Sequence, residues 1–195
     1  VSIEADVSQS DAVGSMARTA EAALGSLDIL VNNAGITHAP APLEDVDEDA
    51  FDRVFAVNAK SVYLTARAVV PGMKARGAGA ILNVASTAGI SPRPRLNWYN
   101  ASKGWMITAT KTMAVELAPA GIRVNALAPV AGETPLLASF LGEDTPEMRT
   151  RFLATIPLGR FSTPRDMGAA AAFLCSDAAG MITGAVLEVD GGRCI

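Results

Sequence analysis

The side chains best suited to acid–base chemistry in this sequence are Tyr99 and Lys103. Residues four apart on a helix lie on one face, about one turn from each other. A phenol has a reference pKa of about 10, so it is a poor acid near neutral pH. A neighbouring ammonium group stabilises the phenolate and lowers that pKa, which would bring Tyr99 into range for proton transfer. The same spacing also fits a half-buried tyrosine beside a solvated lysine. Other motifs of the chain are therefore needed to distinguish a catalytic pair from this alternative.

Three more marked residues, Asn32, Ser86 and Pro129, each follow an apolar run of strand length. Runs of this kind alternate along the chain with helical patterns, which predicts a parallel sheet covered by helices on both faces. Ligands in such sheets bind beyond the carboxyl ends of the strands. We therefore expect the three residues to meet at one edge. The expected strands lie at 27–31, 80–84, 121–127 and 185–189, with the tail of another at 1–6.

Caps and breakers set the expected helices. Acidic residues open the stretch that begins at Asp47, and Pro164 stands at a first helical position, where its missing N–H costs nothing. The segment 129–146 is rich in Gly, Pro and Thr and is predicted to be irregular. The expected helices span 8–23, 47–76, 98–117, 147–154 and 163–175. The 195 residues should form one α/β domain.

Composition narrows the range of partners. The net charge is −4, with no basic run, which argues against nucleic acid or an anionic membrane surface. Cys175 and Cys194 have no metal-ligand spacing, so no metal site is predicted, and two lone thiols fit a reducing cytoplasm. No apolar stretch is long enough to span a bilayer, and no signal peptide is seen. The expected partner is a small molecule.

The order and spacing of these motifs resemble the short-chain dehydrogenase/reductase family, from about Asp6 to the C-terminus. The motifs that carry the resemblance are Asn32-Asn-Ala-Gly35, Asn58, Ser86, Tyr99-x-x-x-Lys103 and Pro129 with Thr134. The resemblance implies a Rossmann-like, doubly wound parallel sheet. It also implies an oxidoreductase that interconverts a secondary alcohol and a ketone. Side chains of these types cannot carry a hydride, so a nicotinamide nucleotide, NAD or NADP, is the implied cofactor.

The resemblance also implies a role for each matching residue. Tyr99 would be the general acid or base, Lys103 would lower its pKa and bind the cofactor ribose, and Ser86 would hold the substrate oxygen. Asn58 would hold a water in a proton relay that starts at Lys103; on its own it is equally a polar residue on an exposed helix face. The implied cofactor-binding residues are Asp6, Asn32, Ala34, Gly35, Tyr99, Lys103, Pro129 and Thr134.

Two departures from the family pattern stand out. The family often has glycine directly after Pro129, and this chain has Val130. The family also begins with a Gly-rich turn, Thr-Gly-x-x-x-Gly-x-Gly, that binds the pyrophosphate, and no such stretch occurs here. By resemblance the domain is N-terminally incomplete, and the residue that selects NAD or NADP is missing. Such an omission would leave 27–31 as an exposed edge strand, an aggregation hazard.

Two segments, 87–98 and 131–156, are expected to line the substrate site. Arg93 and Arg95 either bind an anionic group or are solvated loop charges. The family usually forms tetramers or dimers through the helices that correspond to 47–76 and 98–117, so a homo-oligomer is expected. The apolar candidates for the substrate site are Leu136, Leu137, Phe140, Leu141, Met148 and Phe152.

Two rival interpretations remain. One is a catalytically silent fragment or scaffold of the same fold, which would assemble through its helices but lack the phosphate-binding turn. The other is a hydrolase with Ser86 as nucleophile. No Gly-x-Ser-x-Gly elbow surrounds Ser86, and the sole histidine, His38, would have to act as its base. His38 has no acidic neighbour at ligand spacing and is interpreted as a loop residue.

Overall fold

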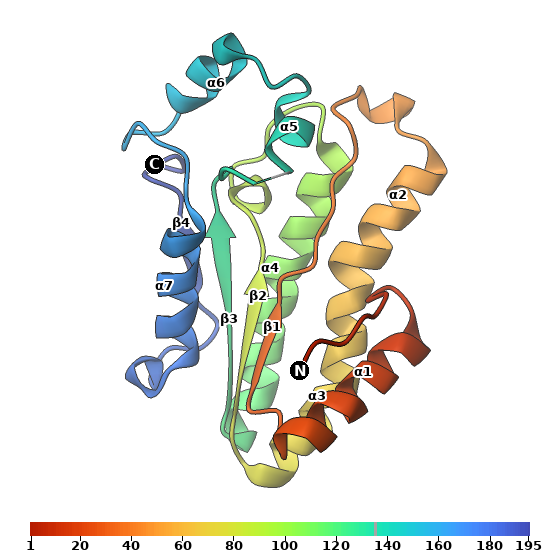
Figure 1. Ribbon diagram of the computed structural model, residues 1–195. Coiled ribbons are helices and arrows are strands. Elements are labelled where there is room, and N and C mark those ends of the chain that lie inside the picture. The colour runs from red at the N-terminus through yellow and green to blue at the C-terminus, as the bar shows by residue number, and fades with distance from the viewer. Residues whose placement is uncertain (135) are drawn as a thin grey trace.

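The computed structural model describes residues 1–134 and 136–195. In this part of the chain, parallel strands form one sheet in the order β1-β2-β3-β4 (Figure 1). The strands are β1 (Ile29–Asn32), β2 (Gly79–Val84), β3 (Ile122–Pro129) and β4 (Val186–Val189). The expected α/β fold with a doubly wound, Rossmann-like sheet is confirmed.

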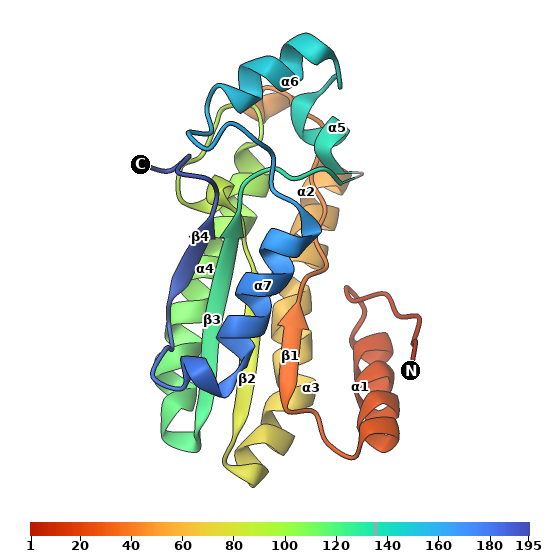
Figure 2. The same cartoon turned by 60° about the vertical axis from the view of Figure 1, so that its left-hand side comes forward.

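Helices cover both faces of the sheet, as the alternating pattern predicts. The long helices α3 and α4 lie on one face and α7 on the other, while α1 packs beside α3 next to β1 (Figures 1 and 2). The helices are α1 (Ser10–Leu24), α2 (Glu48–Phe55), α3 (Ser61–Arg76), α4 (Asn97–Leu117), α5 (Leu136–Leu141), α6 (Pro146–Leu153) and α7 (Pro164–Cys175). Short 3-10 turns lie at Leu43–Asp45, Thr87–Gly89, Ala118–Ala120 and Asp177–Ala179.

The apolar runs of the central strands supply both halves of the core. Ile81 and Val124 are buried against α3 and α4, in one cluster with Met73. Leu82 and Leu127 point to the other face and are buried against Leu174 of α7. Side chains alternate along a strand, so a sheet covered on both faces needs apolar residues at consecutive positions. The strand bounds therefore follow from the runs themselves.

A line of buried polar side chains crosses the sheet between α3 and α4. Thr65 donates to Asn32 Oδ1 (2.8 Å), and Asn32 Nδ2 donates to Asn83 Oδ1 (2.8 Å). Asn83 Nδ2 then donates to Thr110 Oγ1 (2.9 Å). Asn32 and Asn83 are direct partners in the pairing of β1 with β2. Each buried amide is thus satisfied by a neighbour from a different element.

Three expectations about local structure are corrected. Residues 1–6 form no strand; they lead as irregular chain into α1. The stretch 47–76 is not one regular helix, because a π-helical turn at Ala56–Lys60 separates α2 from α3. The segment 129–146 contains a short helix, α5, where Gly and Pro content predicted only irregular chain. Apolar packing of Leu137 and Leu141 around Val130 stabilises α5 in spite of that composition.

β1 lies at the edge of the sheet, as expected for 27–31. Its Ile29 and Val31 side chains are 53% and 45% exposed, respectively, although both are large and apolar. None of the helices in residues 1–134 and 136–195 combines the length and the apolar character that crossing a bilayer requires.

Candidate active site

A cavity of about 490 Å³ opens at the carboxyl edge of the sheet. Its walls come from the ends of β2 and β3, the start of α4 and the beginning of α7, and helices α5 and α6 lie beyond this edge (Figure 1). The structure brings together six of the predicted site residues in its lining: Gly35, Ser86, Tyr99, Lys103, Pro129 and Thr134. The expectation that parallel strands deliver marked residues to one edge is met for Ser86 and Pro129.

Tyr99 is enclosed in the cavity wall. Its side chain is only 4% exposed, and its ring meets Phe140 edge-on with the centroids 5.2 Å apart. Burial raises the pKa of the Tyr99 phenol, and the Ser86 hydroxyl and the charge of Arg93 act in the opposite direction. The net direction differs from the lowering predicted from the Tyr–Lys spacing, because desolvation opposes the charged phenolate.

Lys103 is buried beside Tyr99, not solvated. Its Nζ lies 6.0 Å from the centroid of the Tyr99 ring and donates to the carbonyl oxygen of Val84 (2.8 Å). Burial lowers the pKa of the Lys103 ammonium to about 8. The Val84 carbonyl at the end of β2 compensates part of the lost hydration. Because its pKa stays above 7, Lys103 is mostly charged at neutral pH.

Ser86 follows β2 and caps the 3-10 turn Thr87–Gly89. Its Oγ accepts a hydrogen bond from the Ala88 amide (3.1 Å), which leaves the hydroxyl proton for an acceptor in the cavity. Thr87 fixes the turn by donating to the Pro129 carbonyl (3.2 Å). The ends of β2 and β3 therefore hold Ser86 at the cavity.

Asn58 is completely buried in the π-helical turn, so the exposed-face interpretation is wrong. Its Oδ1 accepts from the Ile36 amide (2.9 Å), and its Nδ2 donates to the Ile36 carbonyl and to Ser102 Oγ (2.9 Å each). A Cβ on Gly35 would lie 3.5 Å from Asn58 Oδ1 and 3.2 Å from Lys103 Nζ. Asn58 thus ties the loop after β1 to α4 immediately beside Lys103.

Three predicted cofactor residues lie outside the cavity lining. Asn32 is committed to the buried polar line across the sheet. Ala34 is exposed, and Asp6 is exposed with its carboxylate accepting from the Ser8 amide and hydroxyl (2.9 and 2.7 Å). These bonds lower the pKa of Asp6. Asn33 lines the cavity where Asn32 was expected; the two-residue period of a strand, which turns consecutive side chains to opposite faces, was the available signal.

The substrate candidates divide in the same way. Phe140 and Phe152 line the cavity, whereas Leu137 and Leu141 are buried in the cluster around Val130. Met148 is not part of the lining, and the side chain of Leu136 lies outside the described residues. Arg93 lines the cavity and Arg95 does not. Sequence reasoning missed Arg193, which reaches the cavity from the C-terminal segment without any local motif to mark it.

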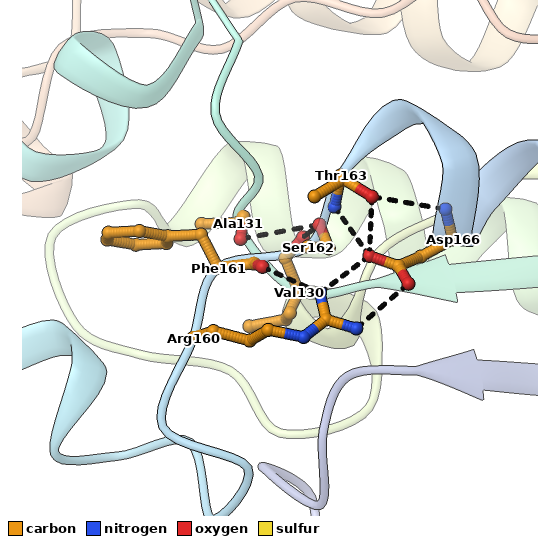
Figure 3. Close-up of polar contacts among 7 residues, drawn as sticks. All are labelled: Val130, Ala131, Arg160, Phe161, Ser162, Thr163 and Asp166. Atoms are coloured by element: carbon orange, nitrogen blue, oxygen red, sulfur yellow. Dashed lines mark hydrogen bonds and ion pairs between the residues drawn. The ribbon is translucent and has the colours of Figure 1, made fainter.

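The start of α7 forms a further wall that the sequence did not identify. Thr163 caps α7 through a reciprocal pair with Asp166: Thr163 Oγ1 accepts from the Asp166 amide (3.3 Å), and Asp166 accepts from the Thr163 amide (2.8 Å) (Figure 3). Arg160 pairs with both carboxylate oxygens of Asp166 (2.7 and 2.9 Å). Ser162 donates to the Val130 carbonyl (3.3 Å) and joins this segment to the end of β3.

His38 is buried in a loop, with Nδ1 2.8 Å from the Ala39 carbonyl oxygen. It is not among the described residues that line the cavity, so it cannot serve Ser86 as a base in this arrangement. The geometry therefore gives no support to the hydrolase alternative.

One acidic group lies apart from the cavity, where Glu188, Asp190 and Cys194 bring their ligand atoms within 4.8 Å of one another. Both oxygens of Asp190 already accept from backbone amides of Gly192 and Cys194 (2.9 and 2.8 Å). Burial and the neighbouring carboxylates raise the pKa of the Cys194 thiol to about 11. Because Asp190 is engaged by these backbone amides, the group is interpreted as structural.

Known proteins share both the sequence and the fold. A family model described as enoyl-(acyl carrier protein) reductase matches residues 1–193. 4-Formylbenzenesulfonate dehydrogenase of Comamonas testosteroni is 51% identical over 189 residues, which are 96% of this chain and 75% of the relative. Cis-4-hydroxycyclohexanecarboxylate dehydrogenase of Sinomonas cyclohexanicum is 40% identical over 190 residues, 97% of this chain and 75% of that protein.

A solved structure agrees closely with the whole fold. The crystal structure of 3-ketoacyl-(acyl-carrier-protein) reductase from Brucella melitensis complexed with NADH superposes with a TM-score of 0.94 and 51% sequence identity. The match covers 99% of this chain and 78% of that chain.

Proposed function

This chain belongs to the short-chain dehydrogenase/reductase family of oxidoreductases, and we propose that it interconverts a secondary alcohol and a ketone with NAD or NADP as hydride carrier. The observation that carries the proposal is the convergence of Ser86, Tyr99 and Lys103 in one cavity. A hydroxyl, a phenol and an ammonium group together can bind and protonate a carbonyl oxygen.

The described residues fit a nicotinamide nucleotide. Gly35 has no side chain, and the space that a Cβ would fill lies beside the Lys103 ammonium group. Asn33, Pro129 and Thr134 line the same cavity. We propose that Lys103 and Tyr99 hydrogen-bond the ribose and that Thr134 binds the carboxamide. The bound nucleotide supplies the hydride in reduction and accepts it in oxidation.

The proton chemistry belongs to the protein. In reduction, Ser86 donates a hydrogen bond to the ketone oxygen and Tyr99 transfers its phenolic proton to that oxygen as the carbonyl carbon gains the hydride. The product is the alcohol and a Tyr99 phenolate, which the Lys103 ammonium group stabilises. Reprotonation of Tyr99 passes through Lys103, and Asn58, buried beside it, holds the loop that borders this path. Oxidation reverses each step, with the Tyr99 phenolate as base.

The experiment compares Tyr99→Phe with Tyr63→Phe. The chain contains two tyrosines, and Tyr63 is half exposed on α3, away from the cavity. Loss of a positioned general acid costs about 10²- to 10⁴-fold in rate, so Tyr99→Phe should abolish ketone reduction by NADH or NADPH while Tyr63→Phe stays active. Retention of more than about a tenth of the turnover in Tyr99→Phe would refute the role of Tyr99.

A silent scaffold of the same fold is the remaining alternative. Titration of the chain with NADH and NADPH, followed by nucleotide fluorescence, separates the two. Saturable binding supports the oxidoreductase and identifies the preferred nucleotide. A folded chain that binds neither nucleotide is the result the scaffold predicts. The convergent cavity favours the enzyme, because a scaffold has no need to bury an ammonium group beside a phenol.

The relatives suggest a substrate class, and features of the chain suggest its location and assembly. The names of the Comamonas and Sinomonas dehydrogenases describe small substrates with an acidic group, and we propose a small molecule of that kind here. The two free cysteines support a location in the cytoplasm. Exposed Tyr63, Trp105 and Val115 on α3 and α4 support a homo-oligomer that pairs through these helices, which sedimentation velocity would measure.

A further inference from the structure

Two arginines from distant parts of the chain meet in the cavity. Arg93 lies in the loop before α4, and Arg193 lies in the C-terminal segment after β4. Both guanidinium groups pack on the ring of Phe152 in α6, with their central carbons 5.2 Å and 4.8 Å from its centroid, respectively. The aromatic ring holds the two charges in place.

Neither guanidinium group of this pair forms an ion pair within the described part of the chain. The ion pairs among the described residues involve Arg76, Arg149 and Arg160, and neither cavity arginine takes part. Arg93 donates instead to the Phe140 carbonyl (2.9 Å), and Arg193 to the Thr155 hydroxyl. The described lining of the cavity contains no carboxylate.

Such an arrangement costs free energy unless an anion completes it. Burial lowers the pKa of Arg93, and the charge of Arg193 lowers it further, so the two groups are close enough to repel each other. Guanidinium groups keep their charge in proteins and bind carboxylates and other oxyanions through paired hydrogen bonds. The unpaired donors of Arg93 and Arg193 form a site for such a group.

The pair also has a defined position relative to the reacting end of the cavity. Phe140 contacts both Tyr99 and Arg93: its ring centroid lies 5.2 Å from the Tyr99 ring centroid and 5.8 Å from the Arg93 guanidinium carbon. A substrate that reaches both Tyr99 and the arginines therefore has the rings of Phe140 and Phe152 beside it in the cavity. Its middle part has to be apolar or aromatic, and its charge has to be at the end opposite the reacting carbon.

We propose that Arg93 and Arg193 bind the carboxylate or sulfonate of a substrate whose alcohol or carbonyl carbon reacts at Tyr99. This inference rests on the proposed function for the reacting end, but the anion site itself is a property of the two arginines. It also separates Arg93 from Arg95, which the sequence left equivalent. Arg95 is exposed, donates to the Pro40 carbonyl (3.4 Å) and does not line the cavity.

The test measures binding directly by calorimetry with the full chain, with and without NADH. The probes are benzoate and benzenesulfonate, which match the aromatic wall and the charge, and benzamide is the neutral comparison. Both anions should bind more tightly than benzamide. Arg93→Gln and Arg193→Gln should each weaken them by about tenfold to a hundredfold, the effect of losing a charge-assisted hydrogen bond. Arg95→Gln is the matched control and should bind as the unaltered chain does.

Three results would overturn the proposal: no saturable binding of either anion, equal affinity for benzamide, or an equal loss in Arg95→Gln. Arg93→Lys guards against a folding artefact, because it keeps the charge and should retain part of the affinity. Failure of the oxidoreductase proposal appears elsewhere, as absent nucleotide binding or as turnover that survives Tyr99→Phe. Anion binding that depends on both arginines would still stand in that case.

Discussion

Gly89, in the turn after Ser86, lies directly against Gly104 in α4. A Cβ on Gly89 would stand 2.8 Å from the Gly104 nitrogen and 2.8 Å from the Lys103 carbonyl carbon, closer than real Cβ atoms approach backbone. The turn that carries Ser86 is therefore seated on the helix that carries Tyr99 and Lys103. The missing side chain at position 89 sets the separation between the two halves of the proposed catalytic group.

This contact predicts an asymmetry between two glycine-to-alanine changes. Gly89→Ala has to move the turn away from the α4 backbone, and it should lower the free energy of unfolding by about 1–3 kcal/mol. A Cβ on Gly104 would lie 3.8 Å from the Gly89 carbonyl oxygen, an ordinary contact, and alanine favours a helix. Gly104→Ala should therefore be neutral or stabilising. Urea unfolding of both variants measures the difference, and equal losses would contradict the seating described above.

The buried charge of Lys103 should lower the stability of the protein, although the proposed reaction requires it. Its folded pKa of about 8 lies below the ordinary 10.5. Below pH 8 both states carry the charge, so its burial costs the folded state the full amount. Between about pH 8 and 10.5 the unfolded chain binds more protons, so the free energy of unfolding rises with pH until that cost disappears.

Replacing Lys103 by methionine removes the buried charge. Lys103→Met should raise the free energy of unfolding at pH 7 by about 1–3 kcal/mol, after the lost bond to Val84 is subtracted. The gain should be much smaller at pH 10, and ketone reduction should be lost. Urea unfolding at both pH values measures this, with Lys111→Met as the control, because Lys111 is exposed on the same helix. A gain that is the same at both pH values would rule out the buried charge as its cause.

Asp166 predicts a sensitivity of the α7 wall to acid. Hydrogen bonds from Arg160 and Thr163 hold the pKa of the Asp166 carboxyl well below its ordinary 3.8. A carboxyl whose pKa is lowered by folding stabilises the protein at pH values above its unfolded pKa of 3.8. That stabilisation is lost as the pH falls from there towards the folded pKa. Asp166→Asn should therefore be less stable at pH 7 and lose less stability from about pH 5 to pH 2.

Thermal unfolding across this range tests the prediction. Asp52→Asn, at an exposed position in α2, is the control for the loss of a surface carboxylate. Parallel pH profiles for Asp166→Asn and the unaltered chain would show that the ionised carboxylate of Asp166 does not stabilise the protein.

The sequence predicted the features that depend on local spacing. Tyr99 and Lys103 share a helix face because they are four apart, and Ser86 reaches the sheet edge because it follows an apolar strand. The direction of the Tyr99 pKa was wrong, because burial depends on Phe140 and the other walls, which come from distant segments. Arg193 was missed for the same reason.

Asn32 illustrates a different limit. The side chain of a polar residue at the end of a strand can lie on either face of the sheet. Asn32 lies where Thr65 of α3 and Asn83 of β2 provide hydrogen-bond partners. The sequence alone does not show which helix supplies a partner. The π-helical turn at 56–60 was hidden in the same way, because the partners that bury Asn58 there, Ile36 and Ser102, come from distant segments.

The bond between Asn32 and Asn83 also restricts how β1 and β2 can be aligned. Two parallel strands of similar apolar residues can slip by two positions and still bury the same faces. A slip here would separate the two amides and leave buried polar groups without partners, at about 1–3 kcal/mol for each group. The amide pair therefore selects one alignment among those that apolar burial alone permits. That alignment places the end of β1 opposite Asn83, one residue before the end of β2, and the residues that follow the two strands, Asn33 and Ser86, both line the cavity.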